Sequence, residues 1–308
     1  MTEKLPQARK SRFELEQSDA NYPEILLARE CVPRTLYGWG QEDALRPGIA
    51  IIGARNATPY GLRIARLVAT WAAELGYVVY SGGARGCDQA AHKGALEAGG
   101  STVIVMGCGA DLVYPGSAGR LFDAATKSGA AVSEYPWGTV PMKHRFRERN
   151  RLIAALADLV VVTEARLPSG TLSTVTHALE LGVPVAAVPG SILCLESAAP
   201  NRLISEGASP ISCRDDLLLA CNLSNSRPDV ASLYTDFTDP DKGTQDESHA
   251  GKIFAALTSM PALPDELAQE LDLSLAEVLE VLGHFEVQGK VVRSADGRYA
   301  GEGGGVLC

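Results

Sequence analysis

The fold is decided by a pattern that first appears in Tyr77-Val-Val-Tyr-Ser-Gly-Gly-Ala-Arg-Gly-Cys-Asp-Gln-Ala-Ala-His92. A short apolar run leads into a glycine-rich loop, and the loop leads directly into a helical pattern. The same alternation extends through residues 48–221, where the apolar runs are 49–53, 77–81, 102–106, 130–134, 159–164 and 183–188. Strands that are apolar throughout and separated by helices predict an α/β fold with a doubly wound, Rossmann-like parallel sheet.

The rest of the chain divides into three parts. Residues 1–47 are a polar N-terminal lead-in, and residues 222–249 are rich in Ser, Pro and Asp, which predicts a flexible acidic linker. Residues 250–302 contain three helical patterns and then the turn sequence Ala295-Asp-Gly297 between two short strands. Ser274 and Glu277 have the capping-box spacing at the start of the third helix. Three helices and a hairpin predict a small C-terminal winged-helix domain.

Composition and charge restrict the class of function. The chain has 308 residues, of which 46% are hydrophobic and 21% charged, as in a soluble globular protein. Its net charge of −9 excludes a uniformly basic nucleic-acid coat but permits a local basic patch. No run of about 18 apolar residues occurs, so we expect no membrane span and no membrane partner. The seven cysteines never have CxxC spacing, which predicts reduced thiols, a cytoplasmic location and no zinc site.

Two loops at the predicted strand ends are rich in small residues, namely Gly53-Ala-Arg-Asn56 and Ser81-Gly-Gly-Ala-Arg-Gly86. Ligands of doubly wound sheets bind at the carboxyl ends of the strands, where exposed N–H groups and helix N-termini attract anions. We therefore expect a phosphate site formed by Arg55, Ser81, Gly82, Gly83 and Arg85. The alternative is that these glycines only permit tight turns. Neither GxGxxG followed by an acid nor GxxxxGK[ST] is present, and we expect no cofactor.

The strongest single feature is Lys143-His-Arg-Phe-Arg-Glu-Arg-Asn-Arg151, with five basic residues and one acidic residue on an otherwise acidic chain. Concentrated positive charge attracts a polyanion, and an aromatic ring within it offers a surface on which an unpaired base can stack. The alternative is a solvated helix start in which Phe146 anchors a loop into the core. Because the two anion loops belong to the same sheet edge, we favour nucleic-acid contact through Lys143, Arg145, Phe146, Arg149, Asn150 and Arg151.

A third loop, Glu164-Ala-Arg-Leu-Pro-Ser-Gly-Thr171, precedes another helix. Its Ser169 and Thr171 offer hydroxyl groups to phosphates, although either could equally be an N-cap. Asn201 follows the last long strand and adds a further polar contact. The five histidines share no metal-ligand spacing, and no Gly-x-Ser-x-Gly sequence occurs. We therefore expect no catalytic residues, no metal and no enzymatic activity.

Taken together, these segments resemble the motifs of the DprA/Smf family. Residues 81–92 resemble SGGARGID…AH, residues 107–115 (GCGADLVYP) resemble GCGLDxxYP, residues 133–136 match SEYP, residues 146–153 (FRERNRLI) resemble FPxRNRxI, and residues 169–171 resemble SGS. The motifs occur in the family's order between residues 22 and 218. Residues from 252 onward are similar to the winged-helix domain that many members carry.

The resemblance implies a single-stranded DNA-binding protein of natural transformation that protects incoming DNA and helps load the RecA recombinase. It also implies a homodimer. In the family, the DNA pocket is lined by the arginine of a GSR motif, the lysine and phenylalanine before RNR, and the serine of SGS, which correspond here to Arg55, Lys143, Phe146 and Ser169. The sequence departs from the family pattern where Ala54 replaces the serine of GSR, where Arg147 replaces a proline, and where Ala199-Pro-Asn201 stands in place of a usual glycine.

Two other classes of function remain as alternatives. Phosphoribohydrolase-like enzymes of the same Rossmann-like superfamily use a PGGxGTxxE motif, but Val175 and Thr176 stand here where its catalytic glutamate falls. A nucleotide-sensing regulator would use the winged helix to bind duplex DNA with its third helix. Residues 275–287 carry three glutamates and no lysine or arginine, which disfavours that contact. Our preferred hypothesis is non-catalytic binding of single-stranded DNA.

Overall fold

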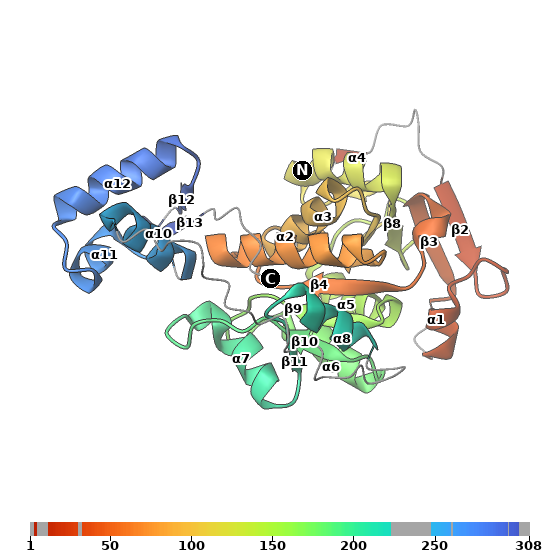
Figure 1. Cartoon of the computed structure of the whole chain (residues 1–308). Coiled ribbons are helices and arrows are strands. Elements are labelled where there is room, and N and C mark those ends of the chain that lie inside the picture. The colour runs from red at the N-terminus through yellow and green to blue at the C-terminus, as the bar shows by residue number, and fades with distance from the viewer. Residues whose placement is uncertain are drawn as a thin grey trace. The chain divides into compact units, whose positions relative to one another are not determined.

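The computed structural model describes residues 3–4, 12–29, 33–222, 248–259, 261–294 and 296–301. The chain divides into two compact units, with the main boundary after residue 225 and the short segment 58–60 grouped with the second unit. The expected linker at 222–249 lies almost entirely outside the described residues, since 223–247 are not among them. Figure 1 follows the chain through both units, which are described one at a time below.

The first unit is built on a sheet of nine strands. These are β2 (Arg12–Glu16), β3 (Thr35–Gly40), β4 (Gly48–Ile52), β5 (Val78–Ser81), β6 (Thr102–Val105), β8 (Ala130–Ser133), β9 (Leu159–Val162), β10 (Val185–Ala187) and β11 (Ser209–Pro210). Their order is β11-β10-β9-β4-β5-β6-β8-β3-β2. Every pair from β11 to β8 is parallel, and β3 and β2 are antiparallel. This confirms the predicted α/β fold with a parallel sheet. Outside it, β1 (Glu3–Lys4) pairs with β7 (Leu112–Val113).

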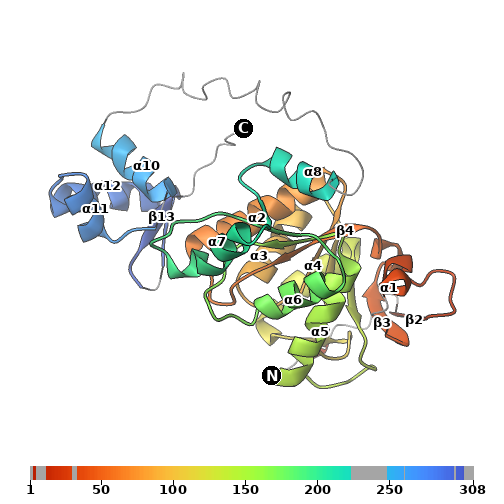
Figure 2. The ribbon, with the colours of Figure 1, turned by 90° about the horizontal axis from the view of Figure 1, so that it is seen from below.

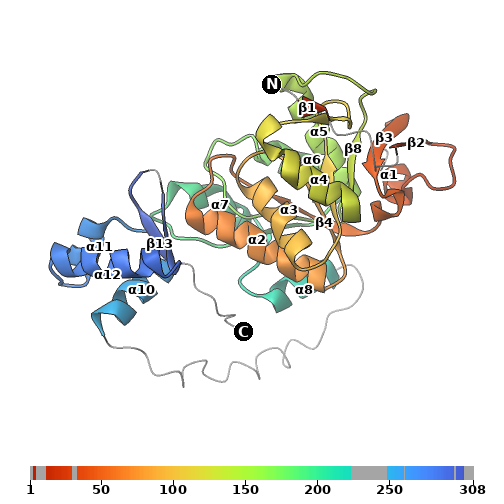
Figure 3. The same cartoon turned by 90° about the horizontal axis from the view of Figure 1, so that it is seen from above.

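Helices cover both faces of this sheet. They are α1 (Glu24–Ala28), α2 (Pro59–Glu74), α3 (Cys87–Glu97), α4 (Gly119–Ser128), α5 (Lys143–Leu156), α6 (Leu172–Glu180), α7 (Ala198–Ser205) and α8 (Arg214–Asn222), with short 3₁₀ turns at Glu42–Ala44, Gly116–Ala118 and Leu195–Ser197. Ile49 and Ile51 pack with α2, α3 and α8, whereas Ala50 and Ile52 pack with α1, α5, α6 and α7. Alternate residues of a strand point to opposite faces, so each buried strand contributes to both layers. The view from below shows α5 and α6 in front (Figure 2), and the view from above shows α2, α3 and α4 (Figure 3).

The N-terminal segment is part of this unit, although the sequence set residues 1–47 apart as a lead-in. β3 pairs with β8 and β2 pairs with β3, which extends the sheet by two antiparallel strands. Arg29, directly after α1, donates from Nη1 to the carbonyl oxygens of residues 155 and 157 at 3.0 and 2.5 Å. These carbonyls end α5 and have no partner within the helix, and a cation there also complements the helix dipole. The segment therefore anchors the C-terminal end of α5.

The second unit contains α10 (His249–Ser259), α11 (Pro264–Glu270), α12 (Leu275–Val287), β12 (Val291–Arg293) and β13 (Tyr299–Gly301). The two strands form an antiparallel hairpin. One core, which includes Ile253, Leu267, Val278 and Leu282, joins the three helices. This arrangement confirms the predicted winged-helix domain.

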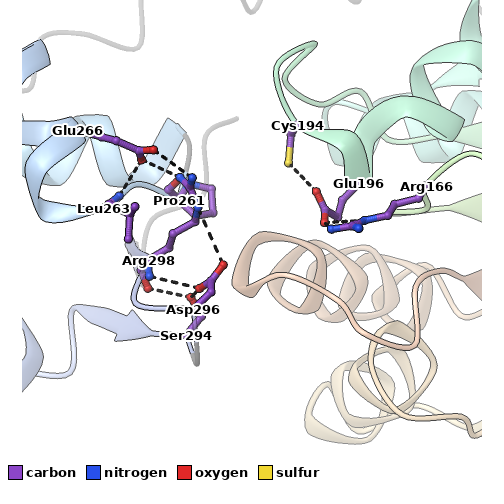
Figure 4. A network of polar contacts seen from close by, with 9 residues as sticks. All are labelled: Arg166, Cys194, Glu196, Pro261, Leu263, Glu266, Ser294, Asp296 and Arg298. Carbon is purple, nitrogen blue, oxygen red and sulfur yellow. Dashed lines mark hydrogen bonds and ion pairs between the residues drawn. The ribbon is translucent and has the colours of Figure 1, made fainter.

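Local polar contacts fix the ends of these elements. Ser274 Oγ accepts a hydrogen bond from the Glu277 N–H at 3.3 Å, and the Glu277 carboxylate accepts one from the Ser274 N–H at 2.9 Å. The capping box predicted for α12 is therefore present. Arg298 joins the hairpin to α11 through two hydrogen bonds to the Glu266 carboxylate, at 2.7 and 3.0 Å (Figure 4). Within the described residues, no helix is both long enough and apolar enough to cross a membrane.

Candidate nucleic-acid interface

The loops that follow the parallel strands meet at one edge of the sheet, which we call the rim. They are residues 53–58 after β4, 82–86 after β5, 106–111 after β6, 134–142 after β8 and 163–171 after β9. We count Tyr114, which follows β7, and residues 143–147 at the start of α5 as part of the rim. β4 lies between β5 and β9, and the helices that follow β4 and β9 pack on opposite faces, so the strand order switches here. The Thr171 hydroxyl donates to the carbonyl oxygen of Gly53 at 3.0 Å and ties the two loops together. Three of the loops that the sequence singled out are therefore neighbours.

The glycine loop after β5 is packed rather than open. Ser81 is fully buried, and its hydroxyl donates to the carbonyl oxygen of Ile51 at 2.7 Å. A Cβ at Gly82 would lie 2.6 Å from a guanidinium nitrogen of Arg149. Gly83 has a φ of +70°, and a Cβ there would lie 2.8 Å from the side chain of Ile104. The Ser81 hydroxyl is therefore used within the fold, and Gly82 and Gly83 are required by close packing, while phosphate contact through the N–H groups of this loop stays a prediction.

Arg149 lies beneath the surface of the rim, with 3% of its area exposed. Its Nη1 donates to the carbonyl oxygen of Gly82 at 2.9 Å and to that of Val105, and its Nε donates to Asn150 Oδ1 at 3.3 Å. Burial lowers the pKa of Arg149 to about 10, an effect that the nearby Asp88 carboxylate opposes. The guanidinium therefore braces the β5 loop and the end of β6 against α5. This corrects the expectation that Arg149 is an open contact for the DNA backbone.

Asp88, in the first turn of α3, is the acidic neighbour of Arg149. It is buried, and its Oδ2 accepts a hydrogen bond from the Ala84 N–H at 3.2 Å. Burial raises the pKa of the Asp88 carboxyl, and Arg149 and the Ala84 N–H act in the opposite direction. Because this carboxylate accompanies Arg149 below the glycine loop, the charge that attracts an anion to the rim has to come from other residues.

Exposed positive charge on the rim comes from Arg55, Arg85, Lys143 and Arg147. In the part of the chain that the structure describes, none of these four side chains forms an ion pair. Arg55 acts on the pKa of both Asp88 and Arg149, which places it close to the buried pair. Arg145 is half-buried, since its Nη1 donates to the carbonyl oxygen of Val140 at 2.6 Å and its Cζ lies 5.3 Å from the ring centroid of Tyr135.

The last two residues of the basic run are engaged within the protein. Arg151 forms an ion pair with Glu134, and both side chains are partly buried. Asn150 donates from Nδ2 to the hydroxyl of Ser173 at 2.7 Å and so joins α5 to α6. Both residues were expected to contact nucleic acid, and the structure uses them to hold α5 in place.

An aromatic pair stands at the start of α5. The ring centroids of Phe146 and Tyr114 lie 5.1 Å apart, with their planes inclined by 31°. The Phe146 ring lies against Gly107, where a Cβ would approach its Cδ1 to 2.6 Å. Phe146 is half-buried, whereas Tyr114 is 42% exposed. Sequence analysis named Phe146 and missed Tyr114, although the glycine at 107 was a signal that a ring packs there.

The remaining polar candidates are tied to neighbouring backbone. Ser169 Oγ accepts a hydrogen bond from the Thr171 N–H at 3.2 Å. Asn201 accepts from the Gly190 N–H at 3.1 Å and donates to the Gly190 carbonyl oxygen at 2.9 Å. Asn201 therefore holds the loop after β10, and the nucleic-acid contact expected for it stays a prediction. A Cβ added at Gly170 would meet no described atom within 4 Å, so this turn leaves open space beside Ser169.

The loop that carries Ser169 is fixed from its other side. Arg166 donates from Nε to Glu196 Oε1 at 2.8 Å, and Cys194 Sγ lies 3.4 Å from Glu196 Oε2 (Figure 4). The Ala165 N–H also donates to the backbone carbonyl of Glu196 at 2.8 Å. These contacts connect the loops after β9 and β10, so residues 163–171 are held at both ends.

His92 and the positions that align with the rival enzymes' glutamate are engaged within the fold. His92 is fully buried, its Nδ1 lies 2.6 Å from the Thr102 hydroxyl, and burial lowers the pKa of His92 to about 3. Among the described residues, no cluster of three or more His, Cys, Asp or Glu side chains is placed to hold a metal ion. Where the rival enzymes have their glutamate, Val175 is buried and Thr176 donates to the carbonyl oxygen of Leu172 at 3.1 Å.

Comparison with known proteins identifies the family to which the chain belongs. The family model of DNA recombination-mediator protein A matches residues 15–222, and that of the DprA winged helix domain matches residues 238–297. The Smf protein of Escherichia coli K12 is 34% identical over 268 residues, which cover 83% of this chain and 71% of that protein. The chain belongs to the DprA/Smf family.

Solved structures of DprA proteins share the fold. DNA processing protein A of Streptococcus pneumoniae is 38% identical, with a TM-score of 0.64 over 67% of this chain and 72% of that chain. The protein of Helicobacter pylori, which has a unique single-stranded DNA binding mode, is 30% identical, with a TM-score of 0.60 over 67% of this chain and 94% of that chain. In this DprA/Smf chain, the matched motif positions Arg55, Lys143, Phe146 and Ser169 all lie on the rim.

Proposed function

We propose that this DprA/Smf chain binds single-stranded DNA along the rim and catalyses no reaction on it. The observation that carries the proposal is a set of exposed cations, Arg55, Arg85 and Lys143, gathered beside an aromatic pair on a chain of net charge −9. A single strand offers both phosphates and unstacked bases, whereas the bases of a duplex are already stacked. The single-stranded DNA binding of the related Helicobacter protein supports the same assignment.

The residues of the rim then divide into two roles. Arg55, Arg85 and Lys143 contact phosphates, with Arg145 and Arg147 beside them, and the pair of Phe146 and Tyr114 meets a base. The turn at 169–171 offers hydroxyl and N–H groups at the start of α6. Below these contacts lie the residues that hold the loops in position: Ser81, Gly82, Gly83, Arg149, Asn150, Arg151 and Asn201.

Fluorescence anisotropy tests the proposal. A labelled oligo-dT of about 20 nucleotides and a duplex of the same length are titrated with the full chain at one salt concentration. We expect the single strand to bind at least about tenfold more tightly, because only its bases are free to stack. Equal affinity, or tighter binding of the duplex, would contradict the proposal. In a parallel incubation with nucleoside monophosphates we expect no released base, and release would favour the rival enzyme.

We further propose, on the family resemblance alone, that the bound strand is incoming DNA in natural transformation and that a cytoplasmic homodimer protects it and helps load RecA. The test uses a single strand that is already covered by a single-strand-binding protein. Adding this chain should shorten the delay before RecA begins to hydrolyse ATP on that DNA. An unchanged delay in the presence of demonstrated DNA binding would remove RecA loading from the function and leave the binding itself in place.

A further inference from the structure

The ring that faces solvent at the start of α5 is Tyr114 rather than Phe146. Phe146 has Tyr114 on one side at a centroid distance of 5.1 Å and rests on the backbone of Gly107. The guanidinium carbon of Arg149 lies 5.9 Å from the Phe146 centroid. Phe146 is thus enclosed by a ring, a backbone segment and a cation. Tyr114, which covers it from outside, keeps 42% of its area exposed.

Other aromatic side chains of the neighbouring loop are engaged within the protein. The Tyr135 hydroxyl donates to Glu148 at 2.8 Å, and Arg145 lies over its ring. Trp137 donates to Glu14 and has Arg12 at 4.8 Å from its ring centroid. By contrast, the Tyr114 hydroxyl has no hydrogen-bond partner among the residues that the structure describes. Tyr114 is therefore the aromatic side chain of this region with both an exposed ring and an unused polar group.

The position of Tyr114 in the chain, shortly after β6, also places it between loops that carry cations. It follows β7, in the segment that continues from the end of β6. β6 lies between β5, whose loop carries Arg85, and β8, whose loop leads to Lys143 at the start of α5. A strand of DNA that runs from one of these cations to the other therefore passes the end of β6.

We propose that Tyr114 is the ring on which a base of the bound strand stacks, and that Phe146 is the positioning residue that supports it from behind. This inference rests on the proposed single-stranded DNA binding and gives it a specific contact. Tyr114 is the tyrosine of the GCGADLVYP segment, but the sequence alone assigned it no contact with DNA. A base stacked on the outer face of Tyr114 extends an aromatic column that the protein has already begun, since Phe146 forms its inner layer.

Variants that keep an apolar side chain at each position test the contact. Tyr114→Leu should weaken binding of oligo-dT about tenfold, because it retains apolar cover for Phe146 but removes the aromatic face. The salt dependence of binding should not change, since no phosphate contact is lost. Tyr114→Phe restores the ring and should recover most of the affinity. Phe146→Leu, which leaves the outer ring in place, should weaken binding less than Tyr114→Leu does.

The matched control is Tyr77→Leu, because Tyr77 directly precedes β5 at the opposite edge of the sheet. It should change the affinity for oligo-dT by less than about twofold. If the unaltered chain binds no oligo-dT, the proposed function and this inference both fail. If the unaltered chain binds and Tyr114→Leu binds equally well, only this inference is overturned. A larger loss in Phe146→Leu than in Tyr114→Leu would also overturn it.

Photocrosslinking provides a second measurement that needs no variant. A 5-iododeoxyuridine placed in the oligo-dT reacts with an aromatic ring on which it stacks, and mass spectrometry of the unaltered complex locates the attachment. We expect the crosslink at Tyr114. A crosslink at Phe146, at Tyr135 or outside the rim would overturn the proposal, even if Tyr114→Leu proved too unstable to titrate.

Discussion

The basic run at the start of α5 has two parts, residues 143–147 and residues 149–151, which carry the same kind of side chain and use it in opposite ways. In the first part, Lys143 and Arg147 are exposed and form no ion pair with a described residue. In the second part, Arg149 is 3% exposed and binds two backbone carbonyls, and Arg151 pairs with Glu134. The number of cations in the run therefore does not give the number of DNA contacts, because successive side chains of a helix point in different directions and meet different environments.

α12 of the winged-helix domain provides a second contrast with the start of α5, residues 143–147. It buries Val278 and Leu282 in its own core and exposes Leu275 and Leu279, each at 47%. Its charged residues, Glu277, Glu280 and Glu286, are exposed and acidic. A helix with this surface repels phosphates, whereas the start of α5 attracts them. The difference predicts that DNA binding depends on the first unit.

Removing the buried arginine should have the largest effect. Arg149→Ala leaves Asp88 buried without its positive neighbour and frees two carbonyl groups, so we expect the free energy of unfolding to fall by about 3–5 kcal/mol. Urea denaturation measures this change. The matched variant Arg147→Ala, from the exposed part of the basic run, should change the free energy of unfolding by less than about 0.5 kcal/mol. Equal stability of the two variants would contradict the distinction between the exposed and buried parts of the run.

Acid should lower the stability of the chain through the buried side chain of His92. Burial lowers the pKa of His92 to about 3, below its unfolded value near 6.5, so the unfolded chain binds more protons between these values. Stability should therefore fall as pH falls below 6.5, with a contribution from His92 of about 1–2 kcal/mol between pH 6.5 and pH 5. In urea titrations, His92→Gln should flatten this slope, and His144→Gln, at an exposed position on α5, should not. If the free energy of unfolding depends on pH equally in the unaltered chain, His92→Gln and His144→Gln, this role of His92 is refuted.

Removing exposed cations should affect binding and leave stability unchanged. Arg55→Ala and Lys143→Ala should each weaken binding of oligo-dT by roughly fivefold near 0.1 M salt and make the slope of log K against log salt shallower by about 0.7. Their urea midpoints should match that of the unaltered chain. A loss of stability similar to that in Arg149→Ala would mean that Arg55 and Lys143, like Arg149, hold the loops of the rim in place.

The smallest effect is expected in the winged-helix domain. Reversing two charges of α12, in Glu280→Lys with Glu286→Lys, should strengthen duplex binding at low salt by only a few-fold, because it replaces repulsion with attraction on one helix face. Anisotropy with a labelled duplex measures this change. Binding of oligo-dT should remain almost the same. A large gain for the single strand would show that α12 takes part in its recognition.

The parallel core of the fold was predictable from the sequence because its strands are buried on both faces and are apolar throughout, as in residues 49–52. The antiparallel edge was not predicted. β2 alternates polar with apolar residues, and β3 contains Gly38, where the Phe13 ring occupies the space that a Cβ would take. The need for glycine at position 38 becomes clear only when β2 is paired with β3 and the Phe13 ring lies over Gly38.

The sequence indicated where the candidate site lies, but it did not reveal which of its side chains are engaged within the protein. Loop composition and the basic run identified the rim, and Arg149 does reach Gly82 across 67 positions of sequence. The same contact explains the error, since whether an arginine faces solvent depends on partners far away in the chain. Asn201 also has a partner that the sequence did not reveal, because its amide makes two hydrogen bonds with the backbone of Gly190.

The salt dependence of oligo-dT binding tests the central claim most directly. With Arg149 buried and Arg151 paired, three to four exposed cations remain to neutralise phosphates, so log K should fall with log salt at a slope of about −2 to −3. The slope is measured for the full chain by anisotropy between low and moderate salt. A slope in that range, with a single strand preferred throughout, is the predicted result. A slope close to zero would contradict the account, because the exposed charge of the rim would then not be contacting DNA.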